Sequence, residues 1–483
     1  MTAITASPPA FGLFVGGRWR DAGRELENRN PARPDAVVST HALAGPAEVD
    51  EAYAAARAAA PGWRRTPPLQ RGEVLFRAAE LLEQRAAAIA AELTAEEGKT
   101  LPEARGEAGR AAAILRYFAG ECAQPVGDML PSAAERTLLY SVREPLGVVC
   151  VITPWNFPIA IPAWKIAPAL AYGNTVVFKP SDLTPLCAVR LVEALADAGL
   201  PPGVLNLVTG MPDAIGDALT GHDEVDAITF TGSNAVGRAI QAAAVPRGVK
   251  VQLELGGKNP VIVLPDADLS LAVDQTLRGA MMSTGQKCTA TSRAIVHPAI
   301  HDEFTERMLS AVRALRVGDG AQEGVQIGPL VSEPQRDRVL GYLDVARSEG
   351  HELLTGGGPG EGSGWFVQPT VYDGVDPGSR IGREEIFGPV LGLMRADDLE
   401  QALAVANAVD FGLSASIFTR DLAAALHFAR EAEVGVVHVN SETAGAEPQA
   451  PFGGMKGSSS HSREQGKAAV EFFTETKTVY ITA

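Results

Sequence analysis

The spacing of hydrophobic residues changes along the chain and predicts two kinds of secondary structure. In the first part, apolar residues recur at helical intervals, and we predict helices at about 46–62, 69–97 and 101–120. From Gly147 onward, apolar residues gather in short β-branched runs at 147–152, 175–179, 204–208, 225–230 and 249–255. Helix-patterned segments separate these runs, for example at 184–198 and 212–220. This alternation predicts a parallel sheet of βαβ units, which binds nucleotides at the carboxyl ends of its strands.

A second α/β series follows Gly257. Its predicted strands lie at 261–264, 294–297 and 434–439. Its predicted helices lie at about 268–283, 299–315, 397–408 and 420–432. We therefore expect a second domain over 257–450, after a first domain formed by 1–125 and 146–256.

Two segments fit neither series. They are 126–145 and the C-terminal stretch 468–483, which contains a strand candidate at 476–482. Paired with each other, they form an arm that adds its edge to the sheet of another subunit, so we expect a homodimer or a homotetramer. The pattern is equally compatible with a strand on the chain's own sheet.

Length and charge narrow the range of functions. A chain of 483 residues is long enough for roughly two to four domains. Its net charge of −16 argues against a nucleic acid or an anionic membrane surface as partner. No apolar run approaches the roughly 18 residues of a membrane span, and the N-terminus lacks the pattern of a signal peptide. We therefore expect a cytoplasmic protein without a membrane partner.

The four cysteines differ in their surroundings. Cys122, Cys150, Cys187 and Cys288 lie far apart, so neither a disulfide framework nor a zinc site is indicated, and we expect no metal. Cys288 lies in the small-residue segment STGQKCTATS, directly after Lys287. A cysteine is usually a small apolar filler, whereas a thiol beside a cation in an open loop is typical of a reactive group.

Polar motifs follow several of the predicted strands. They are TPWNFP (153–158), KPSDLTP (179–185), FTGSNAVG (230–237) and LELGGKNP (253–260). Because they share the carboxyl edge of one parallel sheet, we expect them to form one ligand site. The common dinucleotide fingerprint G-x-G-x-x-G is absent from these turns.

With these motifs the chain resembles the NAD(P)-dependent aldehyde dehydrogenase superfamily. The resemblance extends from EEGKT (96–100) through the four motifs above and GQKC (285–288) to EEIFGPV (384–390) and PFGGMKGS (451–458). It implies an α/β fold with a Rossmann-like NAD(P)-binding domain, an α/β catalytic domain and a small β oligomerisation arm. These correspond to 1–125 with 146–256, to 257–450, and to 126–145 with 468–483.

The resemblance implies three catalytic residues. Cys288 is expected to attack the aldehyde and form first a thiohemiacetal and then a thioester. Asn156, with the backbone N–H of Cys288, is expected to stabilise the oxyanion. Glu254 is expected to activate the water that hydrolyses the thioester. Taken singly, the three would be a packing thiol, a turn residue and a solvated acid.

The resemblance also implies a cofactor site. Lys179 corresponds to the residue that holds the adenosine ribose, and Ser233 to the residue near the pyrophosphate at a helix start. The further expected cofactor residues are Trp155, Ser181, Asp182, Gly232, Gly256, Glu385 and Phe387. A carboxylate at Asp182 would repel a 2′-phosphate by roughly 4 kcal/mol per unit charge at about 4 Å, which predicts NAD, with NADP still possible.

The resemblance places six residues along a tunnel to Cys288. They are Phe157, Ile161, Trp164, Arg278, Met282 and Phe452. Arg278 and Met282 lie four apart on a predicted helix and share a face, so Arg278 could bind a carboxylate in the tunnel or could equally be a solvated charge. The segments 96–107, 153–185 and 283–293 look most similar to the branch that oxidises 2-oxoglutarate semialdehyde (2,5-dioxopentanoate).

Other functions stay open at this point. Succinate semialdehyde or a neutral aliphatic or aromatic aldehyde is an alternative substrate. A cysteine-dependent esterase or acyl transferase would use the same thioester chemistry without redox, but the cofactor motifs argue against it. A cofactor-binding protein without catalysis is disfavoured because Cys288, Glu254 and Asn156 occur together.

Overall fold

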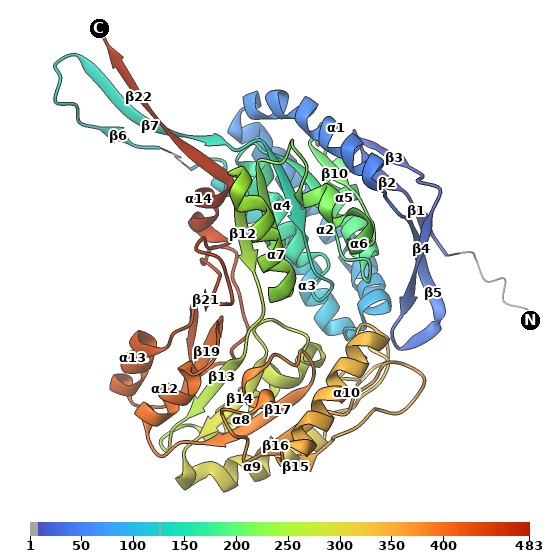
Figure 1. Cartoon of the computed structure of the whole chain (residues 1–483), viewed down its shortest axis with the longest axis vertical. Helices are drawn as coiled ribbons and strands as arrows, with labels where there is room; N and C mark the ends of the chain where they lie inside the picture. The colour runs from blue at the N-terminus through green and yellow to red at the C-terminus, as the bar shows by residue number, and fades with distance from the viewer. Residues whose placement is uncertain (1–7, 125–126) are drawn as a thin grey trace, which may run out of the picture.

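The computed structural model describes residues 8–124 and 127–483, and these form two α/β units and an extended arm (Figure 1). Each unit contains a seven-stranded sheet, and the arm is a separate three-stranded sheet. The fold class is therefore α/β, as predicted. The predicted division near residue 256 falls between the last strand of one large sheet and the first strand of the other, while the domain limits themselves stay a prediction.

The first large sheet has the strand order β12-β11-β8-β9-β10-β2-β3. Its parallel strands are β8 (Val148–Ile152), β9 (Thr175–Lys179), β10 (Leu205–Leu207), β11 (Ala227–Thr231) and β12 (Lys250–Glu254). Two N-terminal strands continue it in the antiparallel sense, β2 (Leu13–Val15) and β3 (Arg18–Arg20). Each of the five predicted strands is present, with limits that differ from the predicted ones by at most two residues.

Helices cover both faces of this sheet. One face packs against α2 (Pro68–Glu97), α3 (Leu101–Glu121), α4 (Ala160–Ala171) and α5 (Pro185–Asp197). The other packs against α1 (Pro46–Arg65), α6 (Pro212–Thr220) and α7 (Asn234–Ala244). Residues of β8 alternate between the two cores, with Val149 and Val151 in one and Val148 and Cys150 in the other. Successive side chains of a strand point to opposite faces of the sheet. Because both faces are buried here, every position is apolar and the strand appears in the sequence as a continuous apolar run.

The second large sheet has the order β15-β16-β17-β14-β13-β19-β20. The strands are β13 (Asn259–Val263), β14 (Thr291–Val296), β15 (Glu352–Thr355), β16 (Thr370–Asp373), β17 (Val390–Arg395), β19 (Ser414–Phe418) and β20 (Val436–Val439). All pairs are parallel except that of β15 with β16. Helices α8 (Leu269–Met281) and α9 (Pro298–Arg313) pack on one face. Helices α10 (Glu333–Ser348), α12 (Leu399–Asn407) and α13 (Leu422–Glu431) pack on the other.

The arm joins two segments that are distant in the sequence. Strand β7 (Thr137–Pro145) pairs antiparallel with β22 (Thr474–Thr482) over nine residue pairs, and β6 (Met129–Leu130) adds a short third strand. The predicted pairing of these segments is therefore confirmed. The alternative, a strand on the chain's own large sheet, is wrong, because the arm forms its own sheet and projects away from both units (Figure 1). Residues 125 and 126 of the predicted arm and first domain lie outside the described residues.

Several elements were not predicted. A small sheet of β1 (Ala10–Phe11), β4 (Glu25–Asn30) and β5 (Arg33–Ala42) precedes the first helix. Three helices were not predicted: α10, α11 (Arg380–Arg383) and α14 (Ala469–Phe473). The strands β16, β17 and β19 were not predicted, nor was the pair of β18 (Phe411–Gly412) with β21 (Met455–Lys456). The 3-10 turns at 245–247, 282–285 and 466–468 were not predicted either. The predicted end of α1 at Pro61-Gly62 is wrong, since the helix continues to Arg65. Trp63, in that last turn, is buried and donates its indole N–H to Leu170 O, which offsets the helix bond that Pro61 lacks.

Candidate active site

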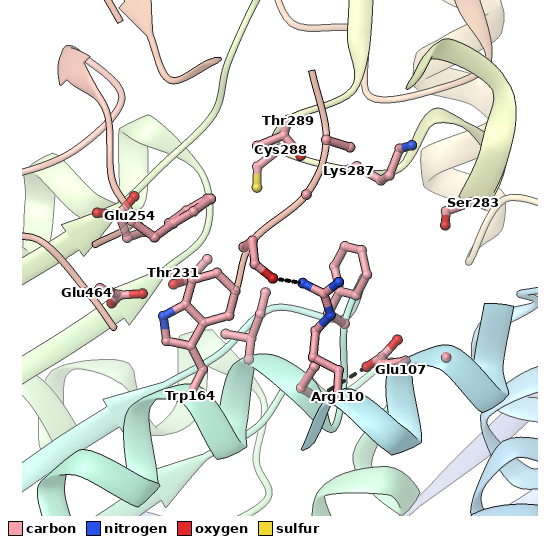
Figure 2. A pocket seen from close by; sticks show the side chains of 18 of the residues that line it. Glu107, Arg110, Trp164, Thr231, Glu254, Ser283, Lys287, Cys288, Thr289 and Glu464 are labelled. Atoms are coloured by element: carbon pink, nitrogen blue, oxygen red, sulfur yellow. Dashed lines mark hydrogen bonds between the residues drawn. The ribbon is translucent and has the colours of Figure 1, made fainter. Parts of the chain in front are cut away.

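Three of the four predicted ligand motifs, at 153–158, 230–237 and 253–260, meet in the cleft between the two α/β units. The segments after β8, β11 and β12 reach it from the carboxyl edge of the first sheet, and the loop that carries Cys288 reaches it from the second unit. Two cavities lie here, one of about 320 Å³ and one of about 150 Å³. Cys288 lines both, so the thiol lies at their junction. The larger cavity is shown in Figure 2.

A strained turn presents Cys288 to the two cavities. After α8 ends at Met281, Ser283 and Thr284 adopt left-handed backbone angles, with φ of 53° and 55°. The Ser283 N–H donates to Glu103 Oε1 at 2.6 Å, and the Thr284 hydroxyl donates to Gly328 O at 3.1 Å. Two consecutive non-glycine residues in this region are costly, and such strain is concentrated at functional sites.

The Cys288 side chain is partly accessible, whereas the other three cysteines are buried. Burial, followed by the nearby carboxyl groups of Glu385 and Glu254, raises the pKa of the Cys288 thiol to about 12. The thiol is therefore protonated at neutral pH in the protein alone. A nucleophilic thiolate requires a base to take its proton or a positive charge to enter the site.

Asn156 is held beside the Cys288 loop. The side chain is buried, and its Nδ2 donates to Gln286 O at 2.9 Å. An amide nitrogen carries two N–H donors, so one remains for a ligand in the smaller cavity, which Asn156 and Cys288 line together. The ammonium group of Lys99 donates to the Asn156 backbone carbonyl and fixes this turn after β8.

Glu254 ends β12 and lines the larger cavity together with Cys288. One carboxyl oxygen, Oε2, accepts a hydrogen bond from the Ser459 hydroxyl at 2.7 Å, whereas Oε1 is buried without a hydrogen-bond partner in the part of the chain that the structure describes. Burial, and then the charge of Glu464, raises the pKa of Glu254 well above its ordinary value. A carboxyl group of this kind can take a proton near neutral pH.

Glu464 and Lys165 form a buried ion pair behind Glu254, and the sequence analysis missed both. Lys165 Nζ also donates to the Thr229 hydroxyl at 2.9 Å. Because Glu464 is neutralised by this ammonium group, it raises the pKa of Glu254 less than an unpaired carboxylate would.

The smaller cavity brings together six of the nine predicted cofactor residues. They are Trp155, Gly232, Ser233, Gly256, Glu385 and Phe387. Trp155 and Phe387 meet edge to face, with ring centroids 5.3 Å apart. Ser233 immediately precedes α7, whose first backbone N–H groups suit an anionic group.

Gly256 and Glu385 are in close contact in this cavity. Glu385 Oε1 accepts the Gly257 N–H at 2.9 Å, and a Cβ atom at position 256 would lie 2.3 Å from Glu385 Oε2. A side chain at position 256 would therefore displace the Glu385 carboxyl group from its position in the cavity. Burial raises the pKa of Glu385 to about 7. Phe387 has a left-handed φ of 62°, a further strained residue at this site.

The other three predicted cofactor residues line neither of the two cavities: Lys179 ends β9, and Ser181 and Asp182 follow it. The neighbouring Thr184 hydroxyl donates to Trp155 O at 3.4 Å, which ties this segment to the smaller cavity. Burial lowers the pKa of Lys179, and the charge of Asp182 partly opposes that shift.

Four of the six predicted substrate residues line the larger cavity, and two do not. Phe157, Ile161, Trp164 and Phe452 line the larger cavity. Trp164 and Phe452 meet edge to face, with ring centroids 4.8 Å apart.

Arg278 and Met282 do not line this cavity, so their prediction is corrected. The Arg278 side chain is 59% exposed and pairs with Asp274, one turn earlier on α8. Met282 packs into the core around α8 and α9. The four-residue spacing placed the two on one helix face, but α8 ends at Met281, so Met282 lies beyond the helix and packs into the core while Arg278 is exposed.

Several residues of the larger cavity were not predicted. Besides Glu464, its polar side chains include Lys99, Glu103, Glu107, Arg110, Lys287 and Glu442. Three of them, Glu103, Glu107 and Arg110, recur at helical spacing along α3 and gave a weak signal in the sequence. A polar stripe of this kind is equally typical of a solvated helix face. The buried ion pair between Lys99 and Glu107, at 2.9 Å, could not be read from the sequence.

Comparison with known proteins agrees with this geometry. The sequence pattern of the aldehyde dehydrogenase family matches residues 19–479. The chain is 49% identical over 474 residues to an alpha-ketoglutaric semialdehyde dehydrogenase of Bacillus subtilis, covering 97% of both chains. It is 44% identical to a 2,5-dioxopentanoate dehydrogenase of Saccharolobus solfataricus, covering 96% of this chain and 98% of the relative.

A solved structure shows the same architecture. The NAD-dependent aldehyde dehydrogenase from Sinorhizobium meliloti superposes with a TM-score of 0.96 at 37% identity, over 98% of this chain and 95% of that one. None of the helices in residues 8–124 and 127–483 has the length and apolarity needed to cross a membrane. The family pattern spans nearly the whole chain and the relatives match it from end to end, so the chain belongs to the aldehyde dehydrogenase family.

Proposed function

We propose that the protein oxidises 2-oxoglutarate semialdehyde to the dicarboxylic acid, with NAD as the hydride acceptor and Cys288 as the nucleophile. One observation carries the proposal: Cys288 lies on the wall shared by two cavities, one lined by Glu254 and aromatic side chains, the other by Glu385 and Phe387. A thiol at such a junction can bond to a carbonyl carbon from one side while a hydride leaves toward the other.

The smaller cavity fits a nicotinamide cofactor. Gly256 leaves the space that Glu385 needs to reach toward a ribose, and Ser233 lies at a helix start suited to a pyrophosphate. When bound, NAD would supply the hydride acceptor. Asp182 favours NAD over NADP through repulsion of a 2′-phosphate, and the Sinorhizobium meliloti structure is described as NAD-dependent.

The first half of the reaction forms the thioester. Cys288 gives its proton to a base, for which the unpartnered Oε1 of Glu254 in the same cavity is available, and its sulfur bonds to the aldehyde carbon, which gives a thiohemiacetal with a negative oxygen. The free N–H of the Asn156 amide and the backbone N–H of Cys288 donate to that oxygen. When the oxyanion collapses, the hydride leaves and a thioester remains on Cys288. Removal of one such donor typically costs about 10²–10³ in rate.

The second half hydrolyses the thioester. Glu254 takes a proton from water, the hydroxide adds to the thioester carbon, and the Cys288 sulfur leaves as the acid is released. The unpartnered Oε1 of Glu254 is the acceptor for that proton, and the raised pKa of this carboxyl group makes it a stronger base than an ordinary glutamate.

The substrate class is supported by two of the relatives, which carry the names alpha-ketoglutaric semialdehyde and 2,5-dioxopentanoate dehydrogenase. Succinate semialdehyde and neutral aliphatic or aromatic aldehydes are the alternatives. The aromatic lining by Phe157, Trp164 and Phe452 would accept a neutral aldehyde. A thioesterase without redox activity is the further alternative that the experiment below separates.

We further propose a homodimer or homotetramer that resides in the cytoplasm. On the arm, Leu138, Tyr480 and Ile481 are exposed, and such an apolar edge is suited to pairing with a second copy. The four free cysteines are typical of a reducing compartment.

The test is a panel of steady-state rates measured by NADH or NADPH absorbance. The panel contains 2-oxoglutarate semialdehyde, succinate semialdehyde, pentanal and benzaldehyde, each with NAD and with NADP. The proposal predicts the highest kcat/KM for 2-oxoglutarate semialdehyde with NAD. A higher value for a neutral aldehyde would reject the substrate, and thioester hydrolysis without aldehyde-dependent NADH would reject the redox function.

A further inference from the structure

Arg110 projects into the larger cavity from α3 and has no role in the chemistry described above. Figure 2 shows its side chain extending from the helix into the pocket, toward the wall that carries Cys288. One guanidinium nitrogen, Nη1, donates to the carbonyl oxygen of Ala446, in a loop that also lines the cavity. A guanidinium group has five N–H donors, so four remain after this bond.

The cationic side chains around the cavity differ in whether a carboxylate lies close enough to pair with them. Lys99 pairs with Glu107 at 2.9 Å, and Lys287 pairs with Glu442 at 3.5 Å. Within residues 8–124 and 127–483, Arg110 has no carboxylate within ion-pair distance. Arg110 is therefore the cation of this cavity whose charge is available to a ligand.

The remaining lining favours the hydrocarbon part of a substrate. Phe157, Trp164 and Phe452 supply aromatic surface in the cavity that the thiol and Arg110 also line. A ligand that suits this arrangement has an aldehyde at one end, a short carbon chain and a carboxylate at the other. Arg278, the arginine that the sequence suggested for this contact, is exposed and pairs with Asp274 outside the cavity.

We propose that Arg110 binds the carboxylate at the far end of the semialdehyde and so determines the specificity of the enzyme for ω-carboxylated aldehydes. This inference rests on the proposed function, because it assigns the recognition of that substrate to one side chain. Guanidinium binds carboxylate through two parallel N–H donors, and this pairing fixes the chain with its aldehyde directed at Cys288.

The test compares two aldehydes of five carbons, 2-oxoglutarate semialdehyde and pentanal, in the full-length enzyme with NAD. The variants are Arg110→Gln, which keeps N–H donors for Ala446 O but removes the charge, and Arg110→Lys. Arg105→Gln is the matched control, because Arg105 is exposed on the same helix and does not line the cavity. Inhibition by glutarate, competitive with the aldehyde, reports carboxylate binding independently of turnover.

In Arg110→Gln, kcat/KM for the semialdehyde should fall about 10–100-fold, mainly through KM, while the value for pentanal changes little. Glutarate inhibition should weaken in parallel, and Arg110→Lys should recover part of both losses. Arg105→Gln should behave as the wild type.

Equal losses for both aldehydes in Arg110→Gln would overturn the inference, since they would show that Arg110 only supports the loop at Ala446. An unchanged preference for the semialdehyde would overturn it as well. Failure of the proposed function would be visible in the wild-type enzyme, which would then show no preference for the semialdehyde over pentanal.

Discussion

The carboxyl group of Glu254 accepts a hydrogen bond from the Ser459 hydroxyl through Oε2 at 2.7 Å and leaves Oε1 without a partner among the described residues. Glu254 lies in the central part of the chain and Ser459 near its C-terminus, and the two residues also form an isolated β-bridge. The bond stabilises the charged carboxylate and lowers its pKa, against the larger raising effect of burial and of Glu464. Ser459 therefore lowers the pKa of the proposed base, while Oε1 stays unpartnered and is the oxygen left to accept a proton.

Substitution of Ser459 by alanine should move the acid limb of the deacylation rate to higher pH. In the proposed mechanism Glu254 acts as a base only when deprotonated, so hydrolysis should slow as pH falls through its raised pKa. Loss of the Ser459 bond raises that pKa further, and we expect the limb to shift upward by about one pH unit. The pH profile of kcat checks this. In the control Ser460→Ala, whose hydroxyl accepts the Leu253 N–H, the limb should stay in place.

Replacement of Glu385 by glutamine should make Cys288 more reactive in the protein without cofactor. Burial is the main cause of the raised pKa of Cys288, about 12, and Glu385 is the largest charge that adds to it. Removal of this charge lowers the pKa and increases the thiolate fraction, so iodoacetamide should alkylate Cys288 several-fold faster at pH 8. Glu384→Gln is the control, because Glu384 pairs with Arg380 instead. Equal alkylation rates in both variants would contradict the assigned cause.

Arg278→Ala should leave KM for semialdehydes unchanged within about twofold, since the exposed ion pair that it removes contributes little to the stability of α8. The Arg278 side chain is exposed and bound to Asp274. Steady-state KM values for 2-oxoglutarate semialdehyde measure this. A selective rise of KM would return Arg278 to the substrate site and would require α8 to move.

Asp182→Ser should increase the use of NADP relative to NAD. In the proposed cofactor site the carboxylate repels a 2′-phosphate, but Asp182 is only half-buried, so water and ions would screen much of that repulsion. We expect the ratio of kcat/KM for NADP to that for NAD to rise about tenfold, which corresponds to about 1.4 kcal/mol. An unchanged ratio would mean that another residue excludes the phosphate.

Much of the fold follows from local patterns. The strand runs at 175–179 and 227–231 and the helices over 68–97 and 101–121 are long or strongly patterned, and they lie close to the predicted positions. By contrast, α10 was missed although its buried residues Val339, Leu343 and Ala346 follow a helical spacing, because they are only three in 16 residues and most of the helix is polar. The strands β16 and β17 are short runs that become recognisable only once the sheet that buries them is known.

Some residues of the site could be predicted from the sequence and others could not, and the difference has a physical reason. Cys288, Glu254 and Asn156 lie in motifs tied to strand ends, where the sheet fixes their positions. Arg278 and Arg110 lie on helices, where the direction of a side chain depends on how the helix packs. Periodicity gives the face that a helical residue shares with its neighbours, but the partner of that face is set by tertiary contacts.

The central claim is that the Cys288 sulfur becomes bonded to the carbonyl carbon of the substrate. In Glu254→Gln, hydrolysis should be slow while acylation continues, so mixing with NAD and the semialdehyde should give a burst of NADH equal to the enzyme concentration. Mass spectrometry of the quenched protein tests the claim most directly. The account predicts an acyl adduct on the peptide that contains Cys288, absent from Glu254→Gln with Cys288→Ala. A full burst with an unmodified Cys288 would contradict it.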